Sequence, residues 1–228
     1  MAHLLHIETA TEQCSVALSK DKECIASRKL LEGGFSHAKQ LHVFIDEVLH
    51  EAKLNPNQLD AVSVSEGPGS FTGLRIGSVA AKGLCFALDI PLIAIPTLQI
   101  LAVPHWENTK VVALLDARRD EVYTAVFDVG GKELTHAQAH VITADSFVDL
   151  THEKVCFVGT GAEKAKAILP ENTNWQFMPT HPVATAMPDL AKVAFDSQQF
   201  TDIGTFAPVY IKPVRITPSK KDVLGRVV

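Results

Sequence analysis

The stretch SEGPGSFTGLRIG, residues 65–77, has the composition of an anion-binding turn. It places four glycines and a proline between an apolar segment and a long run of small residues. A glycine-rich turn that opens a helix points backbone N–H groups outward at the positive end of the helix dipole, which favours phosphate. Gly67, Gly69 and Ser70 would form that site. The spacing fits neither the Walker loop nor the dinucleotide fingerprint, because no Gly-Lys-Ser/Thr follows and Thr72 replaces the third glycine.

The same glycines also predict close packing. Gly69, Gly73, Gly77 and Ala81 recur every four positions, so one stripe of the expected helix carries almost no side chain. Each interior glycine costs up to about 1 kcal/mol of helix propensity, which the close approach of another backbone can offset. The stripe would lie on a sheet or against a neighbouring helix, including one from a partner chain. This interpretation explains more of the residues than phosphate binding does.

Three other segments could take part in a phosphate site. Glu8 ends the first apolar segment, where an acid can hold a metal or a water beside a phosphate; a surface carboxylate is the alternative. Gly159 and Gly161 precede a helical pattern and form a second, weaker anion nest. The charged turn 116–120 is either a salt-bridged hairpin or a binding loop.

The sequence predicts no metal site and no activated nucleophile. His42, Asp46 and His50 share one face of an expected helix, and a solvated polar face explains them better than a metal site. The four cysteines form no Cys-x-x-Cys pair, and neither His-Glu-x-x-His nor Gly-x-Ser-x-Gly occurs.

Apolar periodicity predicts a first α/β lobe. Residues 3–30 are expected to form two or three successive strands, and a helix follows over 36–52 with Ser36 as its N-cap. The apolar face of this helix carries Leu41, Phe44, Ile45 and Val48. A buried strand over 59–65, the small-residue helix over 72–88 and a strand over 90–96 complete the lobe.

A second lobe of similar build is expected after it. Two strands joined by the charged turn lie within 110–134, a strand and a helix within 154–169, and a last helix within 187–200. The predicted division is an N-terminal lobe over 1–105 and a C-terminal lobe over 106–228, with a basic tail from about residue 212.

Composition limits the class of protein. Of 228 residues, 46% are hydrophobic and 21% are charged, and no uncharged apolar run approaches the roughly 18 residues of a membrane span. The N-terminus lacks the features of a signal peptide, so a cytoplasmic protein is expected. The net charge of −5 argues against a chain that grips nucleic acid by itself. From Lys212 onward the charge is +4, which predicts either a solvated terminus or a contact with RNA or an acidic partner.

Five stretches together resemble the TsaB (YeaZ) family. They are LHIETATEQCSVAL, AVSVSEGPGSFTGLRIGSVAAKGLCFAL, IPTLQILA, LLDARRDEVYTAVF and APVYIKP. The resemblance spans nearly the whole chain, and GPGSFTGLRIG and DARRDEVY are specific together. It implies an actin-like ATPase fold, of the sugar kinase, Hsp70 and actin class and ribonuclease H-like, with two α/β lobes.

The resemblance also implies a function and partners. The family acts in the bacterial synthesis of threonylcarbamoyladenosine in tRNA, together with its catalytic paralogue TsaD and the ATPase TsaE. The complex transfers a threonylcarbamoyl group to N6 of the adenosine beside the anticodon, in tRNAs that read codons starting with A. The chain would be a non-catalytic subunit that meets tRNA indirectly and could form a homodimer when alone. The alternatives are a stand-alone nucleotide-binding ATPase or kinase and, last, a peptidase.

Individual residues can be carried over from the resemblance. Glu8 and Thr9 resemble the acid and the hydroxyl of the fold's first phosphate loop, although Asp is expected at position 8, which argues against nucleotide binding. TsaD carries a His-x-x-x-His metal pair in the segment matching residues 93–102, where this chain has no histidine, so neither metal nor cofactor is expected. The TsaD interface is predicted on the two N-terminal helices, at Leu41, Phe44, Ile45, Val48, Gly73, Gly77 and Ala81. A leucine at Gly73 or Gly77 is expected to block the complex and leave the monomer folded.

Overall fold

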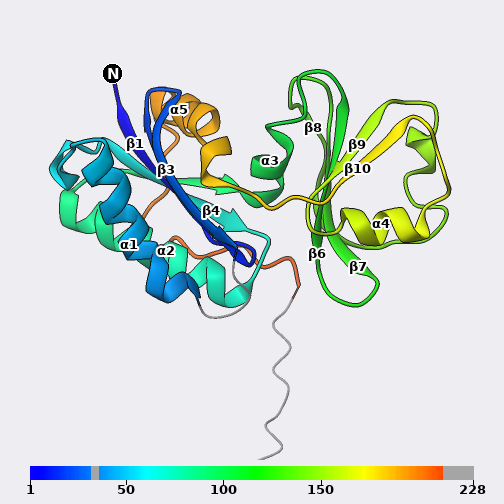
Figure 1. Cartoon of the computed structure of the whole chain (residues 1–228), viewed down its shortest axis with the longest axis horizontal. Helices are drawn as coiled ribbons and strands as arrows, with labels where there is room; N and C mark the ends of the chain where they lie inside the picture. Colours follow the sequence, from blue (N-terminus) through cyan, green and yellow to red (C-terminus); the bar gives the residue numbers. More distant parts are fainter. Residues whose placement is uncertain (32–35, 213–228) are drawn as a thin grey trace, which may run out of the picture.

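The computed structural model describes residues 1–31 and 36–212 and contains two five-stranded sheets (Figure 1). The side chain of Ser36, the predicted N-cap, and the basic tail after Lys212 lie outside the described part. Each sheet belongs to one lobe, and in both the chain first forms an antiparallel meander of three strands. A parallel strand then pairs with the first strand of the meander, and a second parallel strand pairs with that one.

The first lobe has the strand order β3-β2-β1-β4-β5. Its elements are β1 (His3–Glu8), β2 (Gln13–Lys20), β3 (Glu23–Leu31), α1 (Ser36–Glu51), the short 3₁₀ turn Pro56–Gln58, β4 (Ala61–Gly67), α2 (Phe71–Leu88) and β5 (Leu92–Pro96). The strands and helices predicted for this lobe are confirmed. They could be located because their apolar residues recur at the period of a strand or of a helix. Helices α1 and α2 lie along one face of this sheet (Figure 1), and their apolar and small residues pack in its core.

The second lobe repeats that pattern in the order β10-β9-β6-β7-β8. Its elements are β6 (Lys110–Asp116), β7 (Glu121–Phe127), β8 (Glu133–Val141), the 3₁₀ turn Val148–Leu150, β9 (Val155–Val158), α4 (Ala162–Ile168) and β10 (Trp175–Met178). The pairs β6–β7 and β9–α4 agree with the sequence prediction. Strands β8 and β10 were not predicted, because β8 is an almost wholly exposed edge strand without apolar alternation and β10 has only four residues.

Helix α3 (Thr97–Ala102) joins the two lobes and was also not predicted. It has only six residues, too few for a helical period to stand out. Ile100 packs in a core cluster of the first lobe, whereas Leu98 and Leu101 pack against β6 and β7. The helix therefore contributes to both cores at the point where the chain crosses between the sheets.

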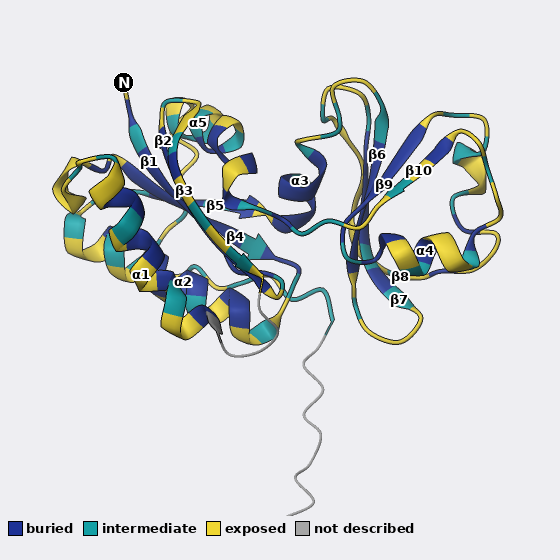
Figure 2. Ribbon diagram, viewed as in Figure 1, coloured by how far each residue is buried: buried dark blue, intermediate teal, exposed yellow. Residues whose placement is uncertain are grey.

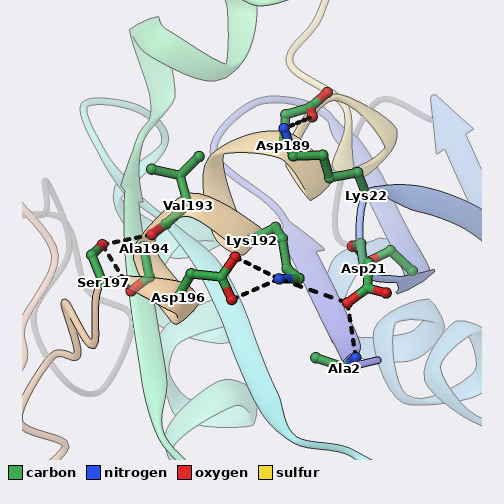
Figure 3. A network of polar contacts seen from close by, with 10 residues as sticks. Ala2, Asp21, Lys22, Asp189, Lys192, Val193, Ala194, Asp196 and Ser197 are labelled. Carbon is green, nitrogen blue, oxygen red and sulfur yellow. Dashed lines mark hydrogen bonds and ion pairs between the residues drawn. The ribbon is translucent and has the colours of Figure 1, made fainter.

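The chain returns to the first lobe after β10. A 3₁₀ turn (Ala184–Ala186) and α5 (Pro188–Asp196) pack against the first sheet on the face opposite α1 and α2 (Figure 2). The predicted division after residue 105 places α5 in the C-terminal lobe, but its apolar residues complete the first core. Lys192 of α5 pairs with Asp196 at 2.5 Å and with Asp21 at 3.7 Å, and the Ala2 N–H donates to Asp21 at 3.0 Å (Figure 3).

Candidate functional site

The glycine turn after β4 packs against the loop that follows β1. The N–H of Ser70 donates to the Ala10 carbonyl at 2.6 Å, and the N–H of Gly73 donates to the Ser70 hydroxyl at 3.3 Å. A Cβ on Gly69 would overlap the Ala10 carbonyl, and Gly67 combines a φ of +118° with a close approach to the Val209 carbonyl. These amides have partners within the chain, so they are not free donors for an anion. Anion binding at this turn stays a prediction.

The stripe of small residues on α2 lies against Thr9. A Cβ on Gly73 would overlap the Thr9 carbonyl oxygen, and one on Gly77 would overlap the Thr9 hydroxyl. That hydroxyl donates to the Gly73 carbonyl at 2.8 Å. Ala81 continues the stripe and is fully buried. The prediction of close packing is confirmed, and the neighbour that approaches is the chain's own β1–β2 loop.

Glu8 lies in the core at the end of β1, so the surface-carboxylate interpretation is wrong. Its carboxyl accepts a hydrogen bond from the Ala10 N–H at 2.5 Å, whereas its second oxygen and the nearby Ser65 hydroxyl are buried without a partner of good geometry. Burial raises the pKa of Glu8 to about 7, and the Ala10 N–H and then Ser65 oppose that rise. A carboxyl with no exposed surface has no open side for a metal or a phosphate water.

The second glycine turn, which follows β9, also donates its backbone N–H groups to carbonyls of its own lobe, as the turn after β4 does. The N–H of Gly161 donates to the Leu114 carbonyl at 3.0 Å, and the N–H of Gly159 donates to the Met178 carbonyl at 3.1 Å. Gly159 has a φ of +113°, and a Cβ there would overlap the Leu114 carbonyl. This turn packs on the first strand of its own lobe, β6, and anion binding stays a prediction.

The charged turn between β6 and β7 is a salt-bridged hairpin, one of the two forms expected of it. Asp116 pairs with Lys164 at 2.7 Å and accepts a hydrogen bond from the Arg118 N–H at 2.6 Å. Arg118 and Arg119 have φ values of 67° and 54°, so this tight turn holds two non-glycine residues in the left-handed region.

The residues predicted for the partner interface are buried within this chain, and the interface itself stays a prediction. The interface was assigned to Leu41, Phe44, Ile45, Val48, Gly73, Gly77 and Ala81, and all of them are buried in this chain. The apolar face of α1 and the small face of α2 point inward because both helices must cover the first sheet. A second chain cannot reach these side chains while the first lobe is folded.

The outer face of the α1–α2 pair is largely exposed (Figure 2), and it carries a different apolar set. The exposed fraction is 47% for Val43 of α1, 71% for Val79 and 79% for Phe86 of α2. A Cβ on Gly83 would meet nothing within 4 Å. Val79, Gly83 and Phe86 are spaced i, i+4, i+7 and share one side of α2. The sequence contained this signal, because these residues lie on the side of the helix away from the glycine stripe.

Among the described helices, α2 alone has the length and hydropathy of a membrane span. It carries Arg75 and Lys82, and its small stripe packs on the sheet, as in a core helix of a folded domain.

Histidines contact serines at two places, and neither forms a catalytic triad. The His6 ring lies between the Ser63 hydroxyl at 2.7 Å and the Ser19 hydroxyl at 2.8 Å, fully buried, and burial lowers its pKa to about 3. His140 contacts the Ser146 hydroxyl at 2.8 Å. No carboxylate bonds either ring in the part of the chain that is described, and no group of three His, Cys, Asp or Glu there could hold a metal. His42, Asp46 and His50 are exposed on α1.

Comparison with known proteins identifies the family of this chain. Residues 33–221 match the family model described as TsaD, tRNA N6-adenosine threonylcarbamoyltransferase. The tRNA threonylcarbamoyladenosine biosynthesis protein TsaB of Haemophilus influenzae is 42% identical, over 53% of this chain and 51% of that protein. The protein of the same name from Escherichia coli is 34% identical, over 59% of each. The matched region thus spans between half and three fifths of these two relatives.

Solved structures are similar over most of the chain. YeaZ from Pseudomonas aeruginosa superposes with a TM-score of 0.80 at 29% identity, covering 92% of this chain and 100% of that one. A second protein of that organism, described as similar to peptidase YEAZ, gives 0.82 at 28% identity, with coverages of 93% and 100%. The ethanolamine utilization protein EutJ of Carboxydothermus hydrogenoformans shares the fold alone, with a TM-score of 0.52 at 11% identity over 83% and 90%. The predicted actin-like ATPase fold of two α/β lobes is confirmed.

Proposed function

The chain belongs to the TsaB (YeaZ) group of the TsaD family, and from this we propose that it is a non-catalytic subunit in the synthesis of threonylcarbamoyladenosine in tRNA. It binds and activates the catalytic TsaD subunit for transfer of threonylcarbamoyl to N6 of the adenosine beside the anticodon. TsaE joins the complex as its ATPase, and this chain contacts tRNA only indirectly. The reaction takes place in the cytoplasm. The names of its relatives support the pathway.

One observation carries the non-catalytic role. The groups that would bind a nucleotide in this fold are used in packing the chain itself. Glu8 has no exposed surface, and Thr9 occupies the space beside the small residues Gly73 and Gly77 of α2. The Ser70 and Gly161 amides donate to carbonyls of the chain. A catalytic phosphate loop needs free donors and a solvent-facing acid, and these positions supply neither.

We place the TsaD contact on the outer face of the α1–α2 pair. Val43, Val79 and Phe86 expose large apolar side chains on two adjacent helices, and Gly83 leaves space for another helix to approach. Exposed apolar groups of this kind mark interaction sites when they lie together. The same surface would support a homodimer in the absence of TsaD.

The alternatives have less support. A stand-alone ATPase or kinase would need Glu8 to reach a nucleotide, which its burial opposes. A peptidase would need a nucleophile with an oriented base. His6 is buried between two hydroxyls, and burial raises the pKa of the Cys14 thiol to about 11, with the Glu8 charge adding to the rise.

Calorimetric titration with ATP and Mg²⁺ separates these functions. The subunit role predicts no tight binding to the isolated chain and no turnover. Tight binding together with hydrolysis that is lost in Glu8→Gln would overturn it. Association is tested in parallel by titrating TsaD into the chain.

A further inference from the structure

We propose that residues 206–212, here called the strap, form a releasable clamp that fixes the angle between the two lobes. The strap runs from α2 to the β6–β7 hairpin, where the described part of the chain ends (Figure 1). This inference concerns the conformation of the chain by itself and does not depend on its partners.

The first lobe holds the strap through backbone and aromatic contacts. The Val209 N–H donates to the Glu66 carbonyl at 2.7 Å, directly beside the glycine turn. Lys82 of α2 donates to the Phe206 carbonyl at 3.0 Å. The Tyr210 ring packs on Phe71, with centroids 5.1 Å apart. The beginning of the strap is therefore bound to both ends of the glycine turn and to α2.

The second lobe holds the far end of the strap through one side chain. The Lys212 ammonium forms an ion pair with the Glu121 carboxylate and donates to the Ala117 carbonyl at 3.4 Å. It also lies 5.9 Å from the centre of the Tyr123 ring. Ala117 and Glu121 flank the tight turn of the β6–β7 hairpin. Lys212 thus binds the β6–β7 hairpin of the second lobe.

The junctions between the lobes differ in strength. The chain also crosses back after β10, where the Gln13 side chain donates to the Pro182 carbonyl at 3.2 Å. Helix α3 is apolar and buried, and it contributes side chains to both cores, as expected of a permanent pivot. The Lys212–Glu121 pair keeps 29% and 36% of its side-chain surface exposed, so salt screens it. The Tyr210 hydroxyl is buried without a hydrogen-bond partner, and this cost offsets part of the stabilisation from the ring contact on Phe71. With α3 as a permanent pivot and the strap as a weaker second contact, the lobes can rotate relative to each other once the strap is released.

Spin-label distances between the lobes test this clamp. Nitroxide labels are placed at His50→Cys on α1 and His136→Cys on β8, with the exposed Cys24 changed to Ser. Double electron–electron resonance is then recorded for the otherwise wild-type chain, for Lys212→Ala, and for Lys212→Ala combined with Tyr210→Ala. Lys110→Ala is the matched control, because it removes a partly exposed Lys–Glu pair, with Glu153, inside the second lobe.

The clamp predicts a narrow distance distribution for the wild type and for Lys110→Ala. The distribution should broaden and shift in Lys212→Ala, and further in the double variant. Raising the salt concentration to about 1 M should broaden the wild type and leave Lys212→Ala unchanged. If the double variant fails to fold by circular dichroism, Lys212→Ala alone decides the matter. Lys212→Ala with the wild-type distribution at both salt concentrations would overturn the proposal.

Discussion

The hydroxyl of Thr9 donates a hydrogen bond to the carbonyl of Gly73 at 2.8 Å, directly across from the missing side chain of Gly77. This contact joins the loop after β1 to the first turns of α2. In an actin-like fold these two segments are positions where a nucleotide's phosphates would be expected. In this chain they bind each other, so the glycines serve the packing of a helix on its own sheet.

Alanine at Gly77 should destabilise the folded chain. A Cβ there would overlap the Thr9 hydroxyl, so Thr9 or the helix must move, at a cost of about 1–3 kcal/mol in the free energy of unfolding. Urea unfolding followed by circular dichroism measures the change. Gly83→Ala in the same helix is the control, and it should be neutral or stabilising by up to about 1 kcal/mol. Equal effects at the two glycines would contradict the packing role of the stripe.

Leucine at Gly73 should likewise unfold or strongly destabilise the monomer, contrary to the expectation from sequence that it blocks only the complex. The Thr9 carbonyl occupies the space that the new side chain needs. Thermal melts of Gly73→Leu and Gly83→Leu should therefore differ, with a large fall in Tm for the first only. A Gly73→Leu protein that melts like wild type would restore the partner interface to this side of the helix.

The buried Glu8 should make the chain less stable as the pH rises. Its folded pKa of about 7 lies above the ordinary value of 4.5, so the unfolded state loses the proton first. The penalty is absent below pH 4.5, grows up to about pH 7, and reaches roughly 3 kcal/mol by the size of the shift. Glu8→Gln should match wild type at pH 4 and exceed it at pH 8 in urea unfolding. A variant less stable than wild type at pH 8 would show that the charged carboxylate is stabilised.

The buried His6 should act in the opposite direction. Burial lowers its folded pKa to about 3 from an ordinary value of 6.5, so stability is lost as the pH falls from 6.5 towards 3. Between pH 4.5 and 6.5 the two groups oppose each other, and the wild type should show little slope. Glu8→Gln should then reveal a stability that falls towards acid, and His6→Gln one that falls towards neutral pH. The slopes decide the result, whatever each variant's overall stability, and unchanged slopes in both variants would refute it.

Much of the fold could be predicted from the sequence because its elements repeat at regular periods. The meander at the start, α1, α2 and the glycine turns were located from apolar spacing and glycine positions. Strand β8 could not be found, since an exposed edge strand needs no apolar alternation. Helix α3 is set by tertiary contacts to two cores, which a six-residue segment does not reveal.

The candidate site was predicted less well than the fold. The sequence showed that the glycine stripe permits close approach, but not what approaches it, because Thr9 is 64 positions away from Gly73. It showed that α1 is amphipathic, yet the apolar side of a helix covers its own sheet first. The residues proposed for the partner contact lie on the opposite side, where Val79 and Phe86 are exposed.

The most direct test of the proposed role is the formation of threonylcarbamoyladenosine in a reconstituted system. Purified TsaD and TsaE, threonylcarbamoyl-adenylate, ATP and tRNA are combined with the wild-type chain, Phe86→Asp, Gly83→Leu or Glu8→Gln. The account predicts product only when the chain and TsaD are both present, loss of product with Phe86→Asp and Gly83→Leu, and full product with Glu8→Gln. Product from the chain without TsaD, or loss in Glu8→Gln with no effect at Phe86 and Gly83, would contradict it.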